Sequence, residues 1–134
     1  MSQQVDFVLL IDDDESTNFF HKLMVEESAV TKNILVAQTG NEGIRLLKEA
    51  LTNPDVNRGL VFIDINMPGM DGWMVVEEIE KLGPDLLSKI SIQMVSASEN
   101  PKDFERIKNT PSIKGHLPKP LSVDAIRKLG NLEM

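Results

Sequence analysis

The stretch at residues 60–72, LVFIDINMPGMDG, decides how the rest of the chain is interpreted. It begins with four apolar residues of mainly β-branched and aromatic type, which predicts a short strand buried on both faces and ending at Asp64. A proline and two glycines then interrupt regular structure, and the apolar spacing after Asp71 is helical. The stretch therefore predicts a strand, a loop and a helix, with an acid at the mouth of the loop. In open α/β sheets, ligands bind at this place, beyond the carboxyl ends of the strands.

Length and composition predict a globular protein. With 134 residues the chain is about one domain, 1–134, and it is long enough to bury a core without disulfides or structural metals. The absence of cysteine is easiest to reconcile with a reducing compartment, and no apolar run approaches the roughly 20 residues that span a bilayer. We therefore expect a cytoplasmic protein with no membrane partner. The formal charge of −7 argues against direct binding to nucleic acid.

The other apolar segments predict a repeated order of strand and helix. Strands are expected at 5–11, 33–38, 60–64, 90–95 and 115–117, and helices at 16–27, 42–51, 72–82, 101–109 and 122–129. The PDLLSK segment at 84–89 is expected to add a turn. Five such units predict an α/β fold in which a five-stranded parallel sheet is covered by helices on both faces.

The helices differ in the apolar surface that they offer. In the first predicted helix, four residues recur at a spacing that puts them on one face: Phe19, Phe20, Leu23 and Met24. His21 in the same helix is interpreted as an exposed side chain. Trp73 and Met74 are interpreted as packing residues of the third helix. The fourth helix offers only Phe104 and Ile107 as apolar residues, so we expect it to be thinly anchored.

Polar residues follow the predicted strands where a parallel sheet brings the strand ends together. Asp12 and Asp13 follow the first strand, Asp64 ends the third, and Ser96 and Lys119 follow the fourth and fifth. Clustered carboxylates raise one another's pKa and destabilise the fold unless a positive charge neutralises them. Mg²⁺ is suited to this role, because it binds a few carboxylate or carbonyl oxygens and keeps several waters. The predicted ligands are Asp12, Asp13, Asp64 and the backbone carbonyl of Asn66.

Spacing alone leaves open which residues of the DDD run at 12–14 bind metal, because a single aspartate there is more often a helix cap. We prefer Asp12 and Asp13, since they follow the strand directly, and assign Asp14 to the start of the helix. Taken alone, Ser96 would serve equally well to satisfy a backbone group, and Lys119 would be an ordinary surface lysine.

A carboxylate beside Mg²⁺, with a lysine and a hydroxyl aimed at the same point, has the parts of a phosphoryl acceptor. Asp64 would attack in line, and the metal and Lys119 would offset charge on the transferring oxygens. Ser96 would hydrogen-bond to the product. Phosphoryl transfer of this kind requires mainly positioning and charge stabilisation.

With these pieces in place, the chain resembles the receiver domain of two-component response regulators. The matching segments are LLIDDDE at 9–15, FIDINMPGMDG at 62–72, MVSAS at 94–98 and HLPKPLS at 116–122. Each is moderately specific alone, but all four in this order are strongly indicative, and the likeness covers nearly the whole chain. It implies a stand-alone chemotaxis-type receiver with a flavodoxin-like three-layer fold, strand order 2-1-3-4-5, and Mg²⁺ as its cofactor.

The resemblance also implies roles for individual residues. Asp64 matches the phosphorylated aspartate, and Asp12 and Asp13 match the acidic pair, with Asp13 on the metal directly and Asp12 mainly through water. Asn66 matches the residue that lends its backbone carbonyl to the metal.

Three further residues match the part of the family pattern that senses the phosphoryl group. Ser96 matches the switch hydroxyl, and Lys119 matches the lysine of the site, which is usually followed by a cis peptide to a proline such as Pro120. His116 stands where the family often has Tyr or Phe, and the chain contains no tyrosine. This departure puts in question the coupling that the aromatic ring provides in the family.

The leading hypothesis is a switch that takes a phosphoryl group from a sensor histidine kinase or phosphotransfer protein onto Asp64 and slowly returns it to water. It would be a phosphoacceptor and not an enzyme, acting on a downstream protein through the surface at 101–129. One alternative is a Mg²⁺-dependent phosphatase of the aspartyl-phosphate type, which usually carries a second aspartate where this chain has Asn66. Another is a degenerate receiver that acts only as an interaction module.

Overall fold

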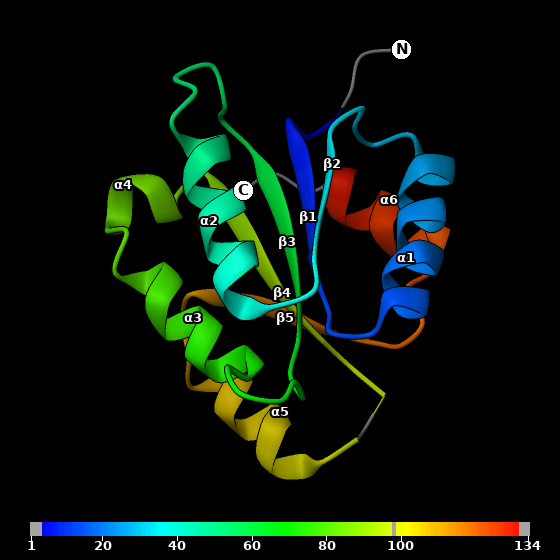
Figure 1. The fold of residues 1–134 in the computed structure, drawn as a ribbon, viewed down its shortest axis with the longest axis vertical. Coiled ribbons are helices and arrows are strands. Elements are labelled where there is room, and N and C mark those ends of the chain that lie inside the picture. Colours follow the sequence, from blue (N-terminus) through cyan, green and yellow to red (C-terminus); the bar gives the residue numbers. More distant parts are fainter. Residues whose placement is uncertain (1–3, 98, 132–134) are drawn as a thin grey trace.

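The computed structural model describes residues 4–97 and 99–131, and its strands form one parallel sheet in the order β2-β1-β3-β4-β5. The strands are β1 (Phe7–Ile11), β2 (Ile34–Ala37), β3 (Gly59–Asp64), β4 (Ile90–Ser96) and β5 (Ile113–Pro118). The helices are α1 (Glu15–Ser28), α2 (Gly40–Leu51), α3 (Gly72–Glu80), α4 (Pro84–Leu87), α5 (Pro101–Lys108) and α6 (Val123–Asn131). Figure 1 shows this arrangement. The predicted fold class and strand order are confirmed.

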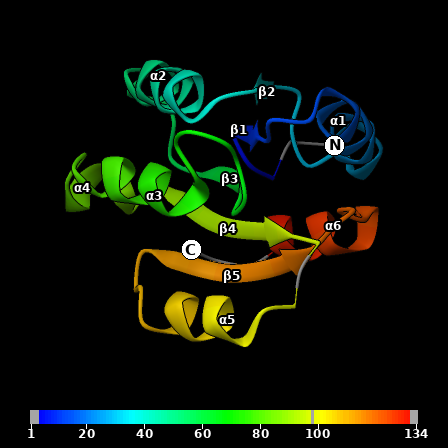
Figure 2. The ribbon, with the colours of Figure 1, turned by 60° about the horizontal axis from the view of Figure 1, so that its bottom comes forward.

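Helices cover both faces of the sheet and give the protein three layers (Figures 1 and 2). The side chains of β1 alternate between two cores, with Phe7, Leu9 and Ile11 in one and Val8 and Leu10 in the other. The first core also receives buried residues of α2 and α3, and the second receives buried residues of α1 and α6. The central strands are apolar on both faces because both faces are covered.

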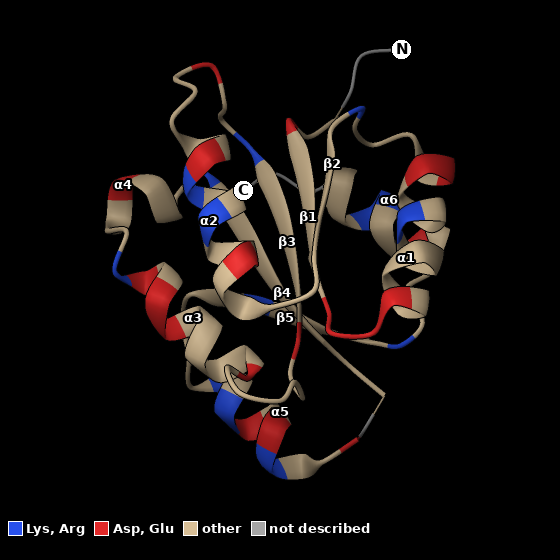
Figure 3. Ribbon diagram, viewed as in Figure 1, with Lys and Arg blue, Asp and Glu red and all other residues tan. Residues whose placement is uncertain are grey.

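The parallel register brings the carboxyl ends of neighbouring strands to the same level. Ile11 of β1 lies opposite Ile63 of β3, so Asp12 and Asp64 follow side by side at one edge of the sheet. Asp64 is in turn opposite Val95 of β4. Figure 3 shows acidic segments after β1 and at the end of β3, at this same end of the sheet.

The boundaries differ from the prediction where local hydrogen bonds extend an element. α2 begins at Gly40, because the Thr39 side chain caps the helix by accepting a hydrogen bond from the Glu42 N–H at 3.1 Å. β5 begins at Ile113, and the segment predicted as a turn forms the short helix α4. Ser98, at the end of the MVSAS motif, lies outside the described residues.

The face that α1 buries differs from the predicted one in three of the four predicted residues; only Met24 packs, partly, against the second core. Phe19, Phe20 and Leu23 are 66%, 41% and 42% exposed. The residues of α1 that are buried are Asn18, His21, Val25 and Ser28. The prediction of an exposed His21 is therefore wrong.

The physical reason lies in two backbone connections at the edge of the sheet. The Asn18 side chain donates to the Asp12 and Ala37 carbonyls at 2.8 and 3.2 Å, and the His21 imidazole accepts the Leu121 N–H at 3.1 Å. Buried backbone groups need such partners, so these two polar residues face the sheet and the helix turns its phenylalanines outward.

α5 is thinly anchored, as its composition predicts. The helix contains no buried residue, and Ile107 packs only partly against the first core. The guanidinium of Arg106 lies 4.3 Å from the centre of the Trp73 ring in α3.

Trp73 is buried, as predicted for a packing residue, but Met74 is exposed, because it lies on the outer side of α3. Among the described residues, none of the helices combines the length and apolar character needed to cross a membrane.

Gly72 allows the start of α3 to lie against the end of β3. A Cβ atom at this position would lie 2.5 Å from the Asp64 carbonyl oxygen and 2.9 Å from the Ile65 Cα. Because these are backbone atoms, they move only if the end of β3 and the loop after it move. We expect Gly72→Ala to lower the free energy of unfolding by about 1–3 kcal/mol, measured by urea denaturation. Met74→Ala on the exposed side of the same helix is the matched control, and an equal loss in both variants would contradict the explanation.

Candidate functional site

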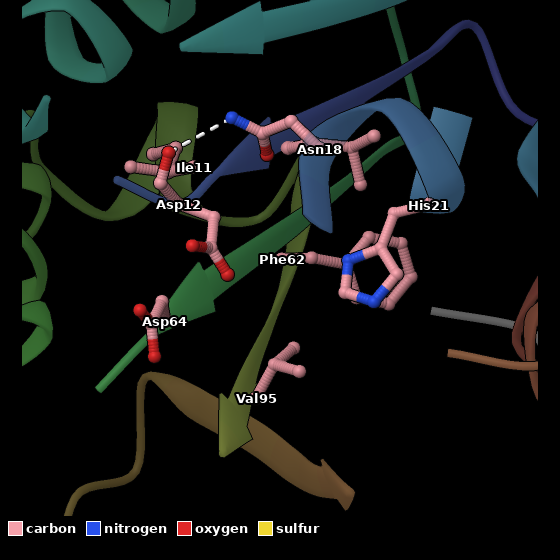
Figure 4. A pocket seen from close by; sticks show the side chains of 8 residues that line it. Ile11, Asp12, Asn18, His21, Phe62, Asp64 and Val95 are labelled. Atoms are coloured by element: carbon pink, nitrogen blue, oxygen red, sulfur yellow. Dashed lines mark hydrogen bonds between the residues drawn. The ribbon is translucent and has the colours of Figure 1, made fainter. Parts of the chain in front are cut away.

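Three carboxylates gather at the edge of the sheet where β1 and β3 end. Asp12 and Asp64 are 3% and 4% exposed, and Asp13 is exposed. One oxygen from each of Asp12, Asp13 and Asp64 lies within 4.8 Å of the others. Figure 4 shows the Asp12 and Asp64 carboxylates in one pocket. The predicted convergence of these three side chains is present in the structure.

Lys119 reaches the two buried carboxylates from the loop after β5. Its Nζ lies 2.7 Å from Asp12 Oδ2 and 3.3 Å from Asp64 Oδ1. The lysine is largely buried, so its ammonium and the two carboxylates interact in an environment with little solvent screening. One ammonium cannot balance three ionised carboxylates, and the cluster of these four residues keeps an excess of negative charge.

The residue after the acidic pair belongs to the helix. Asp14 caps α1, accepting a hydrogen bond from the Thr17 N–H at 3.0 Å, and its own N–H donates to Asp12 Oδ1 at 2.9 Å. The hydrogen bonds from the Thr17 side chain and backbone lower the pKa of Asp14. This capping confirms the assignment of Asp14 to the helix start and leaves Asp12 and Asp13 for the site.

Burial and charge change the acidity of the central groups. Burial, with the negative charge of Asp12, raises the pKa of Asp64 to about 6, although Lys119 and the N–H of Asn66 act in the opposite direction. Burial also lowers the pKa of Lys119, but hydrogen bonds and charges from Asp12 and Asp64 outweigh this and raise it overall. Asp64 is therefore a carboxylate whose negative charge is poorly compensated when no cation is bound.

The donor set fits a hard divalent cation. Carboxylate oxygens are ligands that Mg²⁺ prefers, and the uncompensated charge at Asp64 is what such an ion would relieve. The N–H of Asn66 donates to Asp64 Oδ1 at 3.2 Å, which holds the loop after β3 close to the acids. The use of the Asn66 carbonyl as a ligand stays a prediction.

The predicted hydroxyl of Ser96 and the predicted lysine, Lys119, lie at the ends of two neighbouring strands, β4 and β5. Ser96 ends β4, is buried, and lies opposite Pro118 of β5. Its carbonyl accepts the Lys119 N–H at 3.1 Å. The peptide between Lys119 and Pro120 is cis, as the family resemblance implies.

His116 is half-buried in β5 and contacts α5. Its ring meets that of Phe104 edge-on, with centroids 4.8 Å apart and planes at 77°. Burial lowers the pKa of His116, and its Nε2 is buried without a hydrogen-bond partner among the described residues. The residue thus touches the thinly anchored helix, and it is not among the residues that line the pocket with Asp12 and Asp64.

Two residues that line the pocket were missed by the sequence analysis. Asn18 and His21 lie with Asp12 and Asp64 in the pocket of Figure 4, where the dashed line marks the hydrogen bond from Asn18 to the Asp12 carbonyl. The only sequence signal for them is their helical spacing with the apolar Val25, and it is weak because Asn18 and His21 are themselves polar.

The chain is similar to known receiver domains. The family model described as "Response regulator receiver domain" matches residues 8–130. A two component response regulator from Cytophaga hutchinsonii is 28% identical, with a TM-score of 0.85 and 95% of each chain covered. A CheY-like response regulator receiver domain protein from Methanospirillum hungatei JF-1 is 27% identical, with a TM-score of 0.71, covering 93% of this chain and 90% of that chain.

A third solved structure supports the fold alone. The receiver domain of the histidine kinase CKI1 from Arabidopsis thaliana, complexed with Mg²⁺ and BeF₃⁻, is 22% identical, with a TM-score of 0.77, covering 95% of this chain and 91% of that chain. No curated protein matches the chain.

The raised pKa of Asp64 predicts a pH-dependent stability. Because the folded pKa is about 6, above the ordinary 3.8, stability contributed by the protonated acid is complete below about pH 4 and is lost as pH rises through 6. We expect Asp64→Asn to raise the free energy of unfolding by about 1–3 kcal/mol at pH 7.5 without Mg²⁺, and not at pH 4. Urea denaturation at both pH values checks this. Asp55→Asn, at an exposed acid, is the control, and a gain for Asp64→Asn that is equal at both pH values would contradict the assignment.

Proposed function

The chain belongs to the response regulator receiver domain family, and from this premise we propose that it is a signalling switch in which Asp64 accepts a phosphoryl group from a histidine kinase or phosphotransfer protein. The observation that carries the proposal is the joint position of Asp64, Asp12 and Lys119, with Nζ 3.3 Å from Asp64 and 2.7 Å from Asp12. An ordinary structural ion pair would need only one of the two acids.

The proposed transfer is a displacement at phosphorus. A carboxylate oxygen of Asp64 forms the new P–O bond while the N–P bond of a phosphohistidine breaks, and the electron pair stays on the departing imidazole nitrogen. The Lys119 ammonium offsets charge on the transferred oxygens, and the Ser96 hydroxyl hydrogen-bonds to the product. A pKa of about 6 leaves Asp64 mostly ionised at neutral pH, as the attack requires.

We assign the cation site to Asp12, Asp13, Asp64 and the Asn66 carbonyl, with Asp13 binding directly and Asp12 mainly through water. When bound, Mg²⁺ supplies positive charge for the acids and for the phosphoryl oxygens. The residues themselves prepare this site: the Asn18 side chain fixes the Asp12 backbone, and the Asp14 cap holds the loop that carries Asp13.

The surface next to the site supports a protein phosphodonor. The exposed face of α1 carries Phe19, Phe20 and Leu23, and Phe20 lines a hollow of about 430 Å³ with Lys119 and Pro120. Contiguous exposed apolar side chains are typical of protein interaction surfaces. The proposed partners are therefore proteins, in the cytoplasm, with no direct contact with nucleic acid or membrane.

The proposed output surface is the predicted range 101–129, which includes α5, β5 and most of α6. α5 contains no buried residue, and its contacts include the Phe104–His116 ring pair and Arg106 over Trp73. A helix held by so few contacts is displaced at low energetic cost. Ser96 and Lys119 are joined by a backbone hydrogen bond, so a change at the phosphoryl group reaches the end of β5 directly.

The first prediction of the proposal concerns the modified residue. Incubation with Mg²⁺ and acetyl phosphate should add one phosphoryl group, seen by intact mass and located on Asp64. Asp64→Asn and omission of Mg²⁺ should each abolish the adduct, whereas Asp55→Asn should leave it unchanged. An adduct that persists in Asp64→Asn defeats the assignment, and sustained turnover of a phosphate ester would support the phosphatase alternative.

A second prediction uses Trp73, the only tryptophan of a chain without tyrosine. If α5 moves on activation, Arg106 leaves the ring of Trp73, and beryllofluoride with Mg²⁺ should change the tryptophan emission. In Arg106→Ala the unliganded emission should already be shifted and the response reduced by about half or more. Lys102→Ala, at an exposed position of α5, is the control. An unchanged response in Arg106→Ala would contradict the loss of the Arg106–Trp73 contact as the source of the emission change.

A further inference from the structure

His21 is a buried imidazole that connects two distant parts of the chain. It is 3% exposed in α1, and its Nε2 accepts the backbone N–H of Leu121 at 3.1 Å, across 100 residues of sequence. No step of the proposed transfer uses it. Its place is nevertheless close to the chemistry, because it lines the pocket that contains Asp12 and Asp64 (Figure 4).

The hydrogen bond requires a neutral imidazole with its Nε2 lone pair free. Burial lowers the pKa of His21, with Lys119 adding to this effect and Asp12 opposing it, so the neutral form is favoured. Leu121 is itself buried in the second core, and its N–H has no access to bulk water. The imidazole is therefore the acceptor that this N–H needs.

The same bond fixes the loop on which Lys119 sits. On one side, the Lys119 N–H donates to the Ser96 carbonyl at 3.1 Å, and two residues later the Leu121 N–H is held by His21. His21 also lines the outer hollow together with Lys119 and Pro120. The lysine backbone is thus held from β4 on one side and from α1 on the other.

We propose that His21 is a positioning residue for Lys119. A lysine side chain is long and flexible, so the place of its ammonium depends on where its backbone is fixed. By accepting the Leu121 N–H, the imidazole fixes the position of the Lys119 backbone two residues earlier. From that position Nζ reaches both Asp12 and Asp64. The inference rests on the proposed function, because the positioned lysine matters for phosphoryl transfer to Asp64.

The competing explanation is that His21 only satisfies a buried N–H and contributes general stability. The two differ in what they predict for Lys119. A stabilising residue affects all variants alike, whereas a residue that acts through Lys119 has little left to affect once Lys119 is removed.

The test is a double-mutant cycle on the rate of phosphorylation by acetyl phosphate at saturating Mg²⁺. His21→Leu removes the acceptor and keeps apolar volume, and it should slow phosphorylation about tenfold. His21→Gln keeps an acceptor near the Nε2 position and should stay within about threefold of the unmodified protein. In the Lys119→Ala background, His21→Leu should change the rate by less than about twofold. An equal slowing in both backgrounds overturns the proposal.

NMR of the lysine ammonium groups gives a readout that does not depend on phosphorylation. The Lys119 signal should move toward those of exposed lysines in His21→Leu and return in His21→Gln. A shifted signal in a protein that is never phosphorylated keeps the positioning role and rejects the proposed function. An unshifted signal rejects the positioning role.

Val25→Ala, at a buried apolar position one turn further along α1, is the matched control for stability. It should lower the unfolding midpoint without slowing phosphorylation well below that midpoint. Equal slowing in Val25→Ala overturns the proposal. If His21→Leu does not fold, His21→Asn, whose shorter side chain draws the acceptor away from Leu121, takes its place in the cycle with the same expectations.

Discussion

The mutual repulsion of buried carboxylates is the constraint on which the site depends. Asp12 and Asp64 are held next to each other by the register of β1 and β3, which the apolar packing of the sheet fixes independently of any charge. Lys119 offsets part of the repulsion, at 2.7 Å from one acid and 3.3 Å from the other. The fold therefore holds an unfavourable excess of negative charge at one edge of the sheet, and a bound cation would relieve it.

Around this edge, hydrogen bonds to backbone groups fix the segments that carry the site residues. Asn18 holds the Asp12 backbone, Asp14 caps α1, and the Ser96 carbonyl holds the Lys119 backbone. The rigid part of the molecule is thus concentrated where the acids meet. The weakly held part, α5, lies at the edge strand β5, which is the arrangement that the proposed switch requires.

Much of the fold could be predicted from the sequence, and so could the convergence of the acids. The uninterrupted apolar strands ending in Asp12 and Asp64 predict a parallel sheet, and parallel strands share one carboxyl edge. Prediction failed on α1, where the apolar residues Phe19, Phe20 and Leu23 are exposed and the polar Asn18 and His21 are buried. The rule that apolar residues face the core assumes that the core needs only apolar contacts, and here the sheet edge needs hydrogen-bond partners.

The sequence by itself determined the alternation of strands and helices, the carboxylates at the strand ends and the likeness to receiver domains, because these depend on local periodicity and on short motifs in order. Only the tertiary structure decided which residues outside the acidic cluster meet. The contacts of His21 with Leu121, Arg106 with Trp73 and Phe104 with His116 join segments that no local pattern relates. These contacts form only when each helix packs on the sheet at a particular distance and with a particular rotation about its axis. Both depend on the packing of all the side chains in the two cores together.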